Sequence, residues 1–108
     1  MTPLHPDLAS GRWRTFPLAM QLGNVGSEVS RALKAKERGD AARLGSAIER
    51  MLELLDLTIT DPKNRRRLRE LCRTREVLCD FFIGKNEYHS SGPSLDRYFM
   101  QFAIAAKR

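Results

Sequence analysis

Apolar residues recur at intervals of three and four positions in four stretches of the chain, which is the periodicity of one face of an α-helix. The first two stripes are Leu18, Leu22, Val25, Val29 and Leu33, and then Leu44, Ile48, Met51, Leu55 and Ile59, widened by Leu52. The other two are Leu68, Leu71, Cys72, Leu78, Cys79 and Phe82, and then Leu95, Phe99, Phe102 and Ala106. No stretch has the strict alternation of a β-strand. The pattern therefore predicts four amphipathic helices.

Turn formers and capping residues set the limits of the first two helices. Thr15 is expected to cap the first helix, because threonine is a good N-cap and Pro17 then lies in the first turn. Gly39 is expected to end this helix in a left-handed conformation. Asp40 can cap the second helix, and the sequence ITDP should stop it because residues before proline avoid the α region.

The last two helices carry similar signals. Asp61 is expected to cap the third helix, with Pro62 in its first turn and Gly84 at its end. The stretch KNEYHSSGPS is predicted to be a polar loop, because it consists of turn formers. Ser91 or Ser94 can cap the final helix.

The length of 108 residues corresponds to one domain. Very short connections join the first three helices, so neighbouring helices should run antiparallel. The expected fold is all-α, an up-down-up-down antiparallel four-helix bundle over residues 15–108 with an extended N-terminal arm over residues 1–14. Trp13 and Phe16 are expected to anchor this arm on the core.

Composition narrows the classes of partner. The net charge of +6 favours polyanions, whether nucleic acid, an anionic membrane surface or an acidic protein. No run approaches the ~20 apolar residues that span a bilayer, and the first residues lack the pattern of a secretory signal. We therefore expect a cytoplasmic protein with no membrane partner.

Cysteine and histidine usage gives no indication of a metal or cofactor. Cys72 and Cys79 are seven residues apart on one predicted helix, about 10 Å by helical rise. A disulfide needs Cα atoms within roughly 7 Å, so both are expected to be free and to pack as small buried hydrophobic residues. The only histidines are His5 and His89, too few for a metal site, and no cofactor is expected.

The most charged stretch reads PKNRRRLRELCRTRE, over residues 62–76. The predicted third helix, residues 61–84, holds seven basic and four acidic residues, and its net charge of +3 is half that of the chain. Arg65, Arg69 and Arg73 would form one ridge at i, i+4 and i+8. The planar fork of arginine suits bidentate contacts to phosphate.

Three interpretations of this basic surface stay open. The first is a site for the RNA or DNA backbone, formed by Lys63, Arg65, Arg66, Arg67, Arg69 and Arg73. The second is a docking surface for an acidic protein. The third is a solvated face on which Arg66 pairs with Glu70, and Arg73 with Glu76 or Asp80. No recognisable helix-turn-helix, zinc finger or RNA-binding motif accompanies the arginines.

Small residues gather on one side of the first helix, at Gly23, Gly26, Ser27 and Ser30. A glycine inside a helix costs ~1 kcal/mol relative to alanine, so some close approach should offset this cost. The alternatives are a tight helix crossing within the chain and a subunit interface in a homo-oligomer.

The loop sequence NEYHSS contains the one candidate for catalysis. His89 could act as acid or base with a nearby arginine in a ribonuclease. The helical HEPN ribonucleases, however, carry an arginine four to six residues before the histidine, whereas Arg75 lies fourteen residues before His89. We therefore expect a non-enzymatic protein.

The short basic chain, its four amphipathic helices and its DP-type turn together resemble two related groups of small bacterial proteins. One is the four-helix-bundle family encoded within ribosomal RNA intervening sequences. The other is the basic accessory protein of diversity-generating retroelements, a ring-forming bundle that binds nucleic acid and a reverse transcriptase. The resemblance covers residues 15–107 and transfers no functional residue. It implies a self-associating accessory protein that binds nucleic acid.

Overall fold

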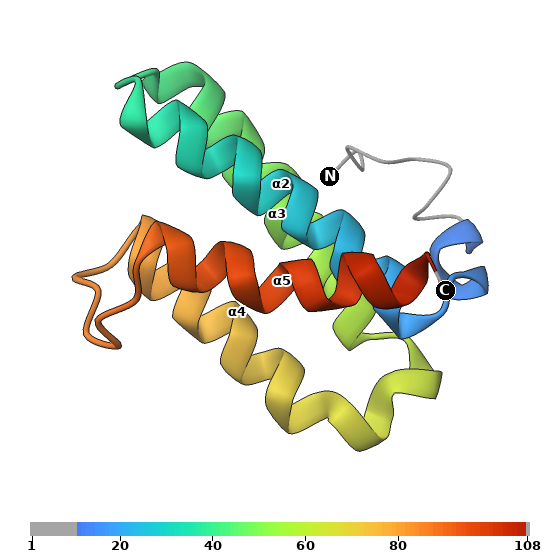
Figure 1. Ribbon diagram of the computed structural model, residues 1–108. Helices are drawn as coiled ribbons and strands as arrows, with labels where there is room; N and C mark the ends of the chain where they lie inside the picture. Colours follow the sequence, from blue (N-terminus) through green and yellow to red (C-terminus); the bar gives the residue numbers. More distant parts are fainter. Residues whose placement is uncertain (1–10, 108) are drawn as a thin grey trace.

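Residues 11–107 are described by the computed structural model, and within this range the chain is all-α, as predicted (Figure 1). The α-helices are α2 (Leu18–Glu37), α3 (Ala41–Ile59), α4 (Leu68–Phe82) and α5 (Gly92–Ala106). Two short 3-10 helices, η1 (Arg12–Thr15) and η2 (Pro62–Arg67), precede α2 and α4. Residues 1–10 of the predicted arm lie outside the described residues, so the division into arm and bundle stays a prediction.

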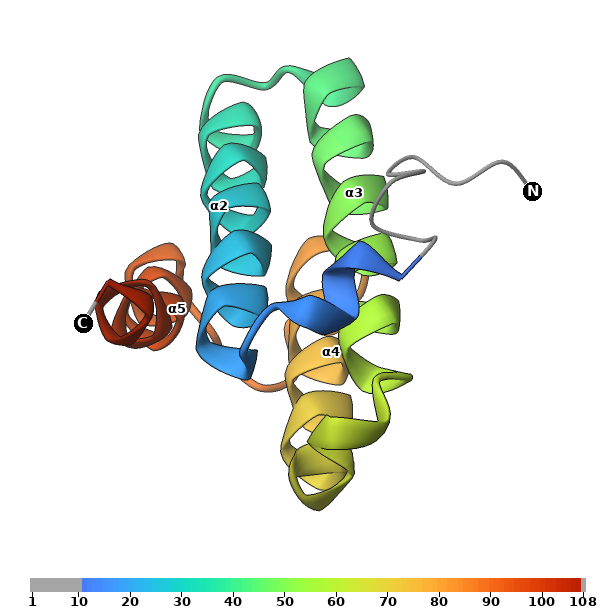
Figure 2. The ribbon, with the colours of Figure 1, turned by 90° about the vertical axis from the view of Figure 1, so that its right-hand side faces the viewer.

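α2, α3 and α4 alternate in direction, whereas α5 lies across them (Figure 2). α2 and α3 form an antiparallel hairpin (Figure 1). α5 packs against α2, and Figure 2 shows it nearly end-on while α2 and α3 stand upright, so it crosses α2 steeply. α4 packs against α3, and α4 and α5 diverge from their shared loop (Figure 1).

All four helices and η1 contribute to one core. Its fully buried members include Trp13, Leu22, Val25, Val29, Met51, Leu55, Leu71 and Leu78. Trp13 is 1% exposed and stacks edge-on against Phe16, so the predicted anchor is confirmed. Residues 12–14 are nevertheless wound into η1 and not extended.

The inward face of α4 differs from the prediction. Leu71, Thr74 and Leu78 are buried, whereas Leu68 is 41% exposed and Cys72 is exposed. Thr74 can face inward because its hydroxyl donates to the carbonyl of Glu70 at 2.9 Å. The polar Thr74 thus takes a position that hydrophobicity alone assigns to Cys72. In the same way Ala106, predicted in the core, is exposed at the end of α5.

The predicted N-cap of the first helix is wrong by two residues. α2 begins at Leu18 with the extended Pro17 as its N-cap. The Thr15 hydroxyl instead donates to the carbonyl of Arg12 at 2.6 Å, which closes η1. Thr15 is therefore two residues too early to cap α2, which begins only after Pro17.

The turn between α2 and α3 is confirmed. Gly39 has φ of 66°, a left-handed conformation that glycine adopts without steric cost. Its N–H donates to the carbonyl of Lys36, and that of Asp40 donates to Ala35, as in a Schellman motif. The Asp40 carboxylate then accepts the N–H of Arg43 at 3.1 Å and caps α3.

The predicted caps of the third and fourth helices are confirmed, but the third helix begins as a 3-10 helix. Asp61 accepts the N–H of Lys63, but the helix it caps is the 3-10 helix η2, and α-helical structure starts only at Leu68. Ser91 and Ser94 act together, because each side chain accepts the backbone N–H of the other. This reciprocal box fixes the start of α5.

Candidate nucleic-acid interface

A buried polar network lies beneath the basic segment and holds it in place. The Trp13 indole N–H donates to the Thr58 hydroxyl at 3.0 Å. The Gln21 amide donates to the Trp13 carbonyl at 2.9 Å and to the Asp61 carboxylate at 3.0 Å. The Asn64 amide donates to the Gln21 side-chain oxygen at 2.8 Å and to the Thr58 carbonyl at 3.0 Å. These bonds join η1, α2, α3 and η2.

Every member of this network is satisfied, which makes the network a rigid support. In the described part of the chain, no buried side-chain nitrogen or oxygen lacks a hydrogen-bond partner. A fully satisfied buried polar cluster specifies one arrangement, because any other leaves groups unpaired at ~1–3 kcal/mol each. The hydrophobic pattern does not single out Gln21 or Asn64. Asn64 lies three residues after the predicted cap Asp61, whereas no local signal marks Gln21, which is eight residues from Trp13.

Lys63 ties the two 3-10 helices together. Its ammonium group contacts the Asp61 carboxylate and donates to the Arg14 carbonyl at 3.0 Å. Burial raises the pKa of Asp61, but the hydrogen bonds from Lys63 and Gln21 outweigh burial and hold that pKa below its usual value. The exposed Arg14 therefore lies next to η2, and the basic surface extends onto η1.

Three arginines of this surface are free to bind a ligand. Arg65 and Arg66 on η2 and Arg69 on α4 are exposed, and within residues 11–107 their side chains make no ion pair or hydrogen bond. All six predicted contact residues, Lys63, Arg65, Arg66, Arg67, Arg69 and Arg73, are exposed. The predicted straight ridge is nevertheless wrong at Arg65. A 3-10 helix turns every three residues, so only Arg69 and Arg73 keep the α-helical spacing.

The other arginines of η2 and α4 are paired. Arg67 pairs with Glu70 at 2.7 Å, so the predicted pair of Arg66 with Glu70 is wrong. This bond lowers the pKa of Glu70, burial raises it, and the hydroxyl of Tyr98 lowers it again to leave a net decrease.

Further along α4, the pairs that involve arginine are of two kinds. Arg73 approaches Glu76 at 3.7 Å, as predicted, on an exposed surface where such a pair contributes little. Arg75 donates to Asp56 at 2.8 Å and so links α4 to α3. The charge left for a partner is therefore concentrated at the η2 end of α4.

The loop after α4 is ordered by the other predicted partner of Arg73. The Asp80 carboxylate accepts the backbone N–H groups of Glu87 and Tyr88 at 2.8 and 3.0 Å. The Asn86 side chain exchanges two hydrogen bonds with the backbone of Ser90, at 2.8 and 2.9 Å. Tyr88 is 43% exposed, and its ring centre lies 5.7 Å from the guanidinium of Arg73.

The side chain of His89 is exposed and makes no hydrogen bond or ion pair within the described residues, and its backbone φ is 54°. Among residues 11–107 there is also no group of three or more histidine, cysteine, aspartate or glutamate side chains placed to hold a metal ion.

The glycines of α2 serve the crossing with α5. A Cβ atom on Gly26 would lie 2.6 Å from the Cβ of Phe99, and one on Gly23 would lie 3.3 Å from the Cα of Ala103. The two glycines therefore allow α5 to approach the backbone of α2. Ser27 is exposed, and its hydroxyl reaches the Gly23 carbonyl at 3.4 Å. Ser30 lines a groove instead.

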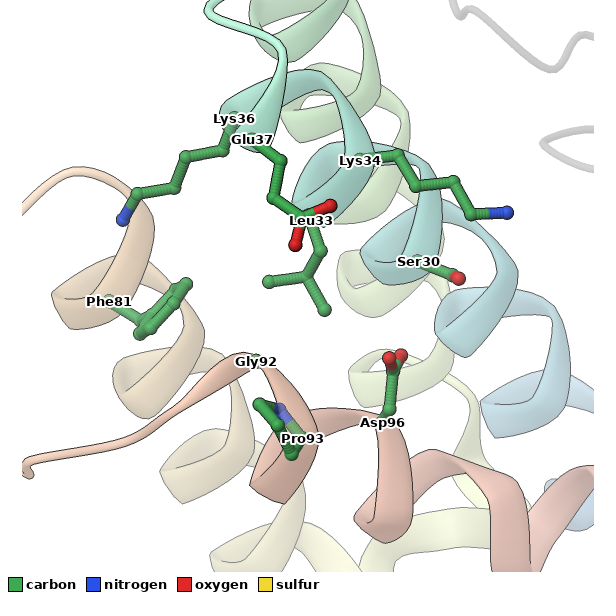
Figure 3. Close-up of a pocket in the computed structure, with 9 residues that line it drawn as sticks. All are labelled: Ser30, Leu33, Lys34, Lys36, Glu37, Phe81, Gly92, Pro93 and Asp96. Carbon is green, nitrogen blue, oxygen red and sulfur yellow. The ribbon is translucent and has the colours of Figure 1, made fainter.

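That groove, of about 580 Å³, lies between α2, α4 and the start of α5 (Figure 3). Leu33, Phe81 and Pro93 form its apolar part, and Lys36 reaches over Phe81 at 4.2 Å from the ring centre. Figure 3 shows the carboxylates of Glu37 and Asp96 pointing toward the groove. The groove is lined by these two carboxylates and by two lysines, Lys34 and Lys36, so its lining has no net positive charge, unlike the basic surface.

A second groove, of about 320 Å³, lies between α4 and α5. Most of its exposed lining is apolar, from residues such as Leu78, Leu95 and Phe99, and the polar residues that line it include Arg73, Ser90 and Glu70, which is paired with Arg67. This groove therefore adjoins both the arginines of α4 and the Tyr88 loop.

Comparison with known proteins gives no further identification. The chain matches no family model, and no curated protein or solved structure is significantly similar to it. The part of the expected resemblance that the structure supports is the fold, a compact all-α protein with four α-helices. Across residues 11–107 no helix is both long and apolar enough to cross a membrane.

Proposed function

We propose that this protein is a non-enzymatic, basic accessory protein that binds the backbone of RNA or DNA through η2 and the start of α4. One observation carries the proposal: Arg65, Arg66 and Arg69 are exposed and unpaired on a segment that a buried network holds rigid. A fixed segment loses little conformational entropy on binding, and the unpaired guanidinium groups break no internal ion pair.

The expected binding is electrostatic and largely independent of base sequence. Phosphate contacts position a nucleic acid but do not specify it. Each neutralised phosphate contributes about −0.9 to the slope of log affinity against log salt for a duplex, and about −0.7 for a single strand. Three free arginines, supported by Arg73 and Arg14, therefore predict a slope of roughly −2 to −4.

The test is a titration of labelled DNA and RNA at two salt concentrations. Replacing Arg65, Arg66 and Arg69 with alanine should abolish most of the affinity and reduce the salt slope. The matched control replaces Lys34, Arg38 and Arg97, three exposed cations of α2, its C-cap and α5, so that net charge falls equally. Equal loss in both variants would show that only total charge matters and would refute a localised site.

The same experiment separates nucleic acid from an acidic protein partner. If neither DNA nor RNA binds at low salt, the proposal fails. Binding of polyglutamate alone, lost on replacing the same three arginines, would assign the surface to an acidic protein instead. If the protein binds DNA or RNA, the partner that it would assist as an accessory protein is an enzyme that acts on nucleic acid, such as a reverse transcriptase.

Self-association is the second part of the proposal. α5 exposes Met100 and Ile104, which are 56% and 51% exposed and one helical turn apart. A second copy covering this face would remove both from water. Met100→Lys and Ile104→Lys together should then lower the mass measured by light scattering, and an unchanged mass would exclude this face as the interface.

A further inference from the structure

The loop between α4 and α5 holds an exposed aromatic ring beside the basic surface. Tyr88 is 43% exposed, and the guanidinium of Arg73 lies 5.7 Å from its ring centre. Arg73 is one α-helical turn from the unpaired Arg69. Arg69, Arg73 and the exposed Tyr88 therefore follow one another along this side of α4.

The backbone around Tyr88 is fixed on both sides. The Asp80 carboxylate accepts the N–H of Tyr88 itself, and the Asn86 side chain bonds the backbone of Ser90 twice. Asn86 and His89 both have φ of 54°, a left-handed conformation that is uncommon outside glycine. Such a conformation persists only where its surroundings enforce it, and here they hold an aromatic ring at the surface.

We propose that the nucleic acid bound by this protein is single-stranded, with a base stacked on Tyr88 and the adjacent phosphates on Arg69 and Arg73. This inference rests on the proposed function and specifies its ligand. A base has a free face for stacking in a single strand, whereas in a duplex its neighbours cover that face. Proteins that bind single strands without sequence preference combine a basic track with such aromatic platforms.

The groove between α4 and α5 is consistent with this ligand. Arg73 and Ser90 line it, so it adjoins the Tyr88 platform, and most of its exposed lining is apolar. Its volume of about 320 Å³ lies at the lower end of the range for small-ligand pockets. An unpaired base next to the stacked one can enter this groove, which a base held within a duplex cannot do.

The experiment measures anisotropy of labelled oligothymidylate, oligouridylate, an abasic strand and a duplex, all of equal length. The unaltered protein should bind the strands with bases more tightly than the abasic strand and the duplex. Tyr88→Ala should weaken oligothymidylate and oligouridylate binding by about 5-fold to 150-fold, the range for loss of one base–aromatic stack. Tyr88→Phe keeps the ring and should bind as the unaltered protein does.

Inorganic polyphosphate, which has phosphates but no bases, distinguishes stacking from support of Arg73. Its affinity, measured by calorimetry, should be unchanged in Tyr88→Ala. Equal losses for polyphosphate and for the strands with bases would overturn the inference, as would equal or tighter binding of the duplex or the abasic strand by the unaltered protein. Those results leave the proposed function standing. Failure of every nucleic acid to bind at low salt would overturn both.

Discussion

Replacement of Asn64 with alanine tests whether the buried network supports the basic segment. Asn64 donates to the Gln21 side-chain oxygen at 2.8 Å and to the Thr58 carbonyl at 3.0 Å. Without it, the Thr58 carbonyl still accepts the N–H of Asp61, but the Gln21 oxygen loses its partner inside the protein. Two lost hydrogen bonds and one unpaired acceptor correspond to about 2–3 kcal/mol of the free energy of unfolding.

This loss is large enough to measure by thermal unfolding. In a domain of about 100 residues, 1 kcal/mol lowers Tm by about 4–8 °C, so circular dichroism should show a decrease on the order of 10 °C. Asn24→Ala is the matched control, because the Asn24 amide bonds only the Met20 carbonyl one turn earlier in α2. This control should unfold within a few degrees of the unaltered protein, since alanine favours a helix.

The variant also changes binding without removing a charge. At a temperature where Asn64→Ala is still folded, it should bind DNA more weakly than Asn24→Ala, because η2 is no longer held in one conformation. If Asn64→Ala unfolds at the same temperature as the control and binds DNA equally well, the buried network is not what positions the arginines.

Three further outcomes follow from other contacts. Gly26→Ala should destabilise the protein by about 1–3 kcal/mol in urea unfolding, because the new Cβ would lie 2.6 Å from Phe99. Gly45→Ala is the control, and it should stabilise α3 by up to ~1 kcal/mol because its Cβ would have no neighbour within 4 Å. Equal effects of the two substitutions would contradict the tight crossing of α2 and α5. The pKa of Asp61 is lower in the folded than in the unfolded protein, so Asp61 contributes stability above about pH 4 that is lost as pH falls through the lower folded pKa. The free energy of unfolding should therefore fall less steeply with acid in Asp61→Asn than in the unaltered protein. An unchanged slope would contradict this linkage. Cys72 is exposed and Cys79 half-buried, so a thiol reagent should modify Cys72 first, as identified by mass spectrometry, and the reverse order would contradict the orientation of α4.

Local signals predicted the turns well because their chemistry is complete within a few residues. Gly39 and Asp40 adopt the predicted geometry, and Ser91 and Ser94 form a box from side chains three positions apart. Neither turn depends on a contact distant in the sequence, so a single sequence was sufficient to place both of them.

The basic segment could be located from the sequence, but its shape could not. Nothing in PKNRRR separates an α-helix from a 3-10 helix. The winding of η2 accompanies the burial of Asn64, whose partners Gln21 and Thr58 belong to α2 and α3. For the same reason, the small residues around Gly26 indicated a close approach, but only the structure shows that Phe99 of α5 is the neighbour.

The buried network also has a consequence for the divergence of related chains. Gln21 is forty residues from Asp61 and eight from Trp13, and it bonds the Asp61 carboxylate, the Trp13 main-chain carbonyl and the Asn64 amide, so substitution of Gln21 removes three hydrogen bonds at once. These residues should therefore change together or not at all, whereas Arg65, Arg66 and Arg69 need only keep their charge. Distant homologues should be recognisable by a tryptophan, a glutamine eight residues later and an Asp-Pro-x-Asn segment further along, even where no arginine occupies the same position.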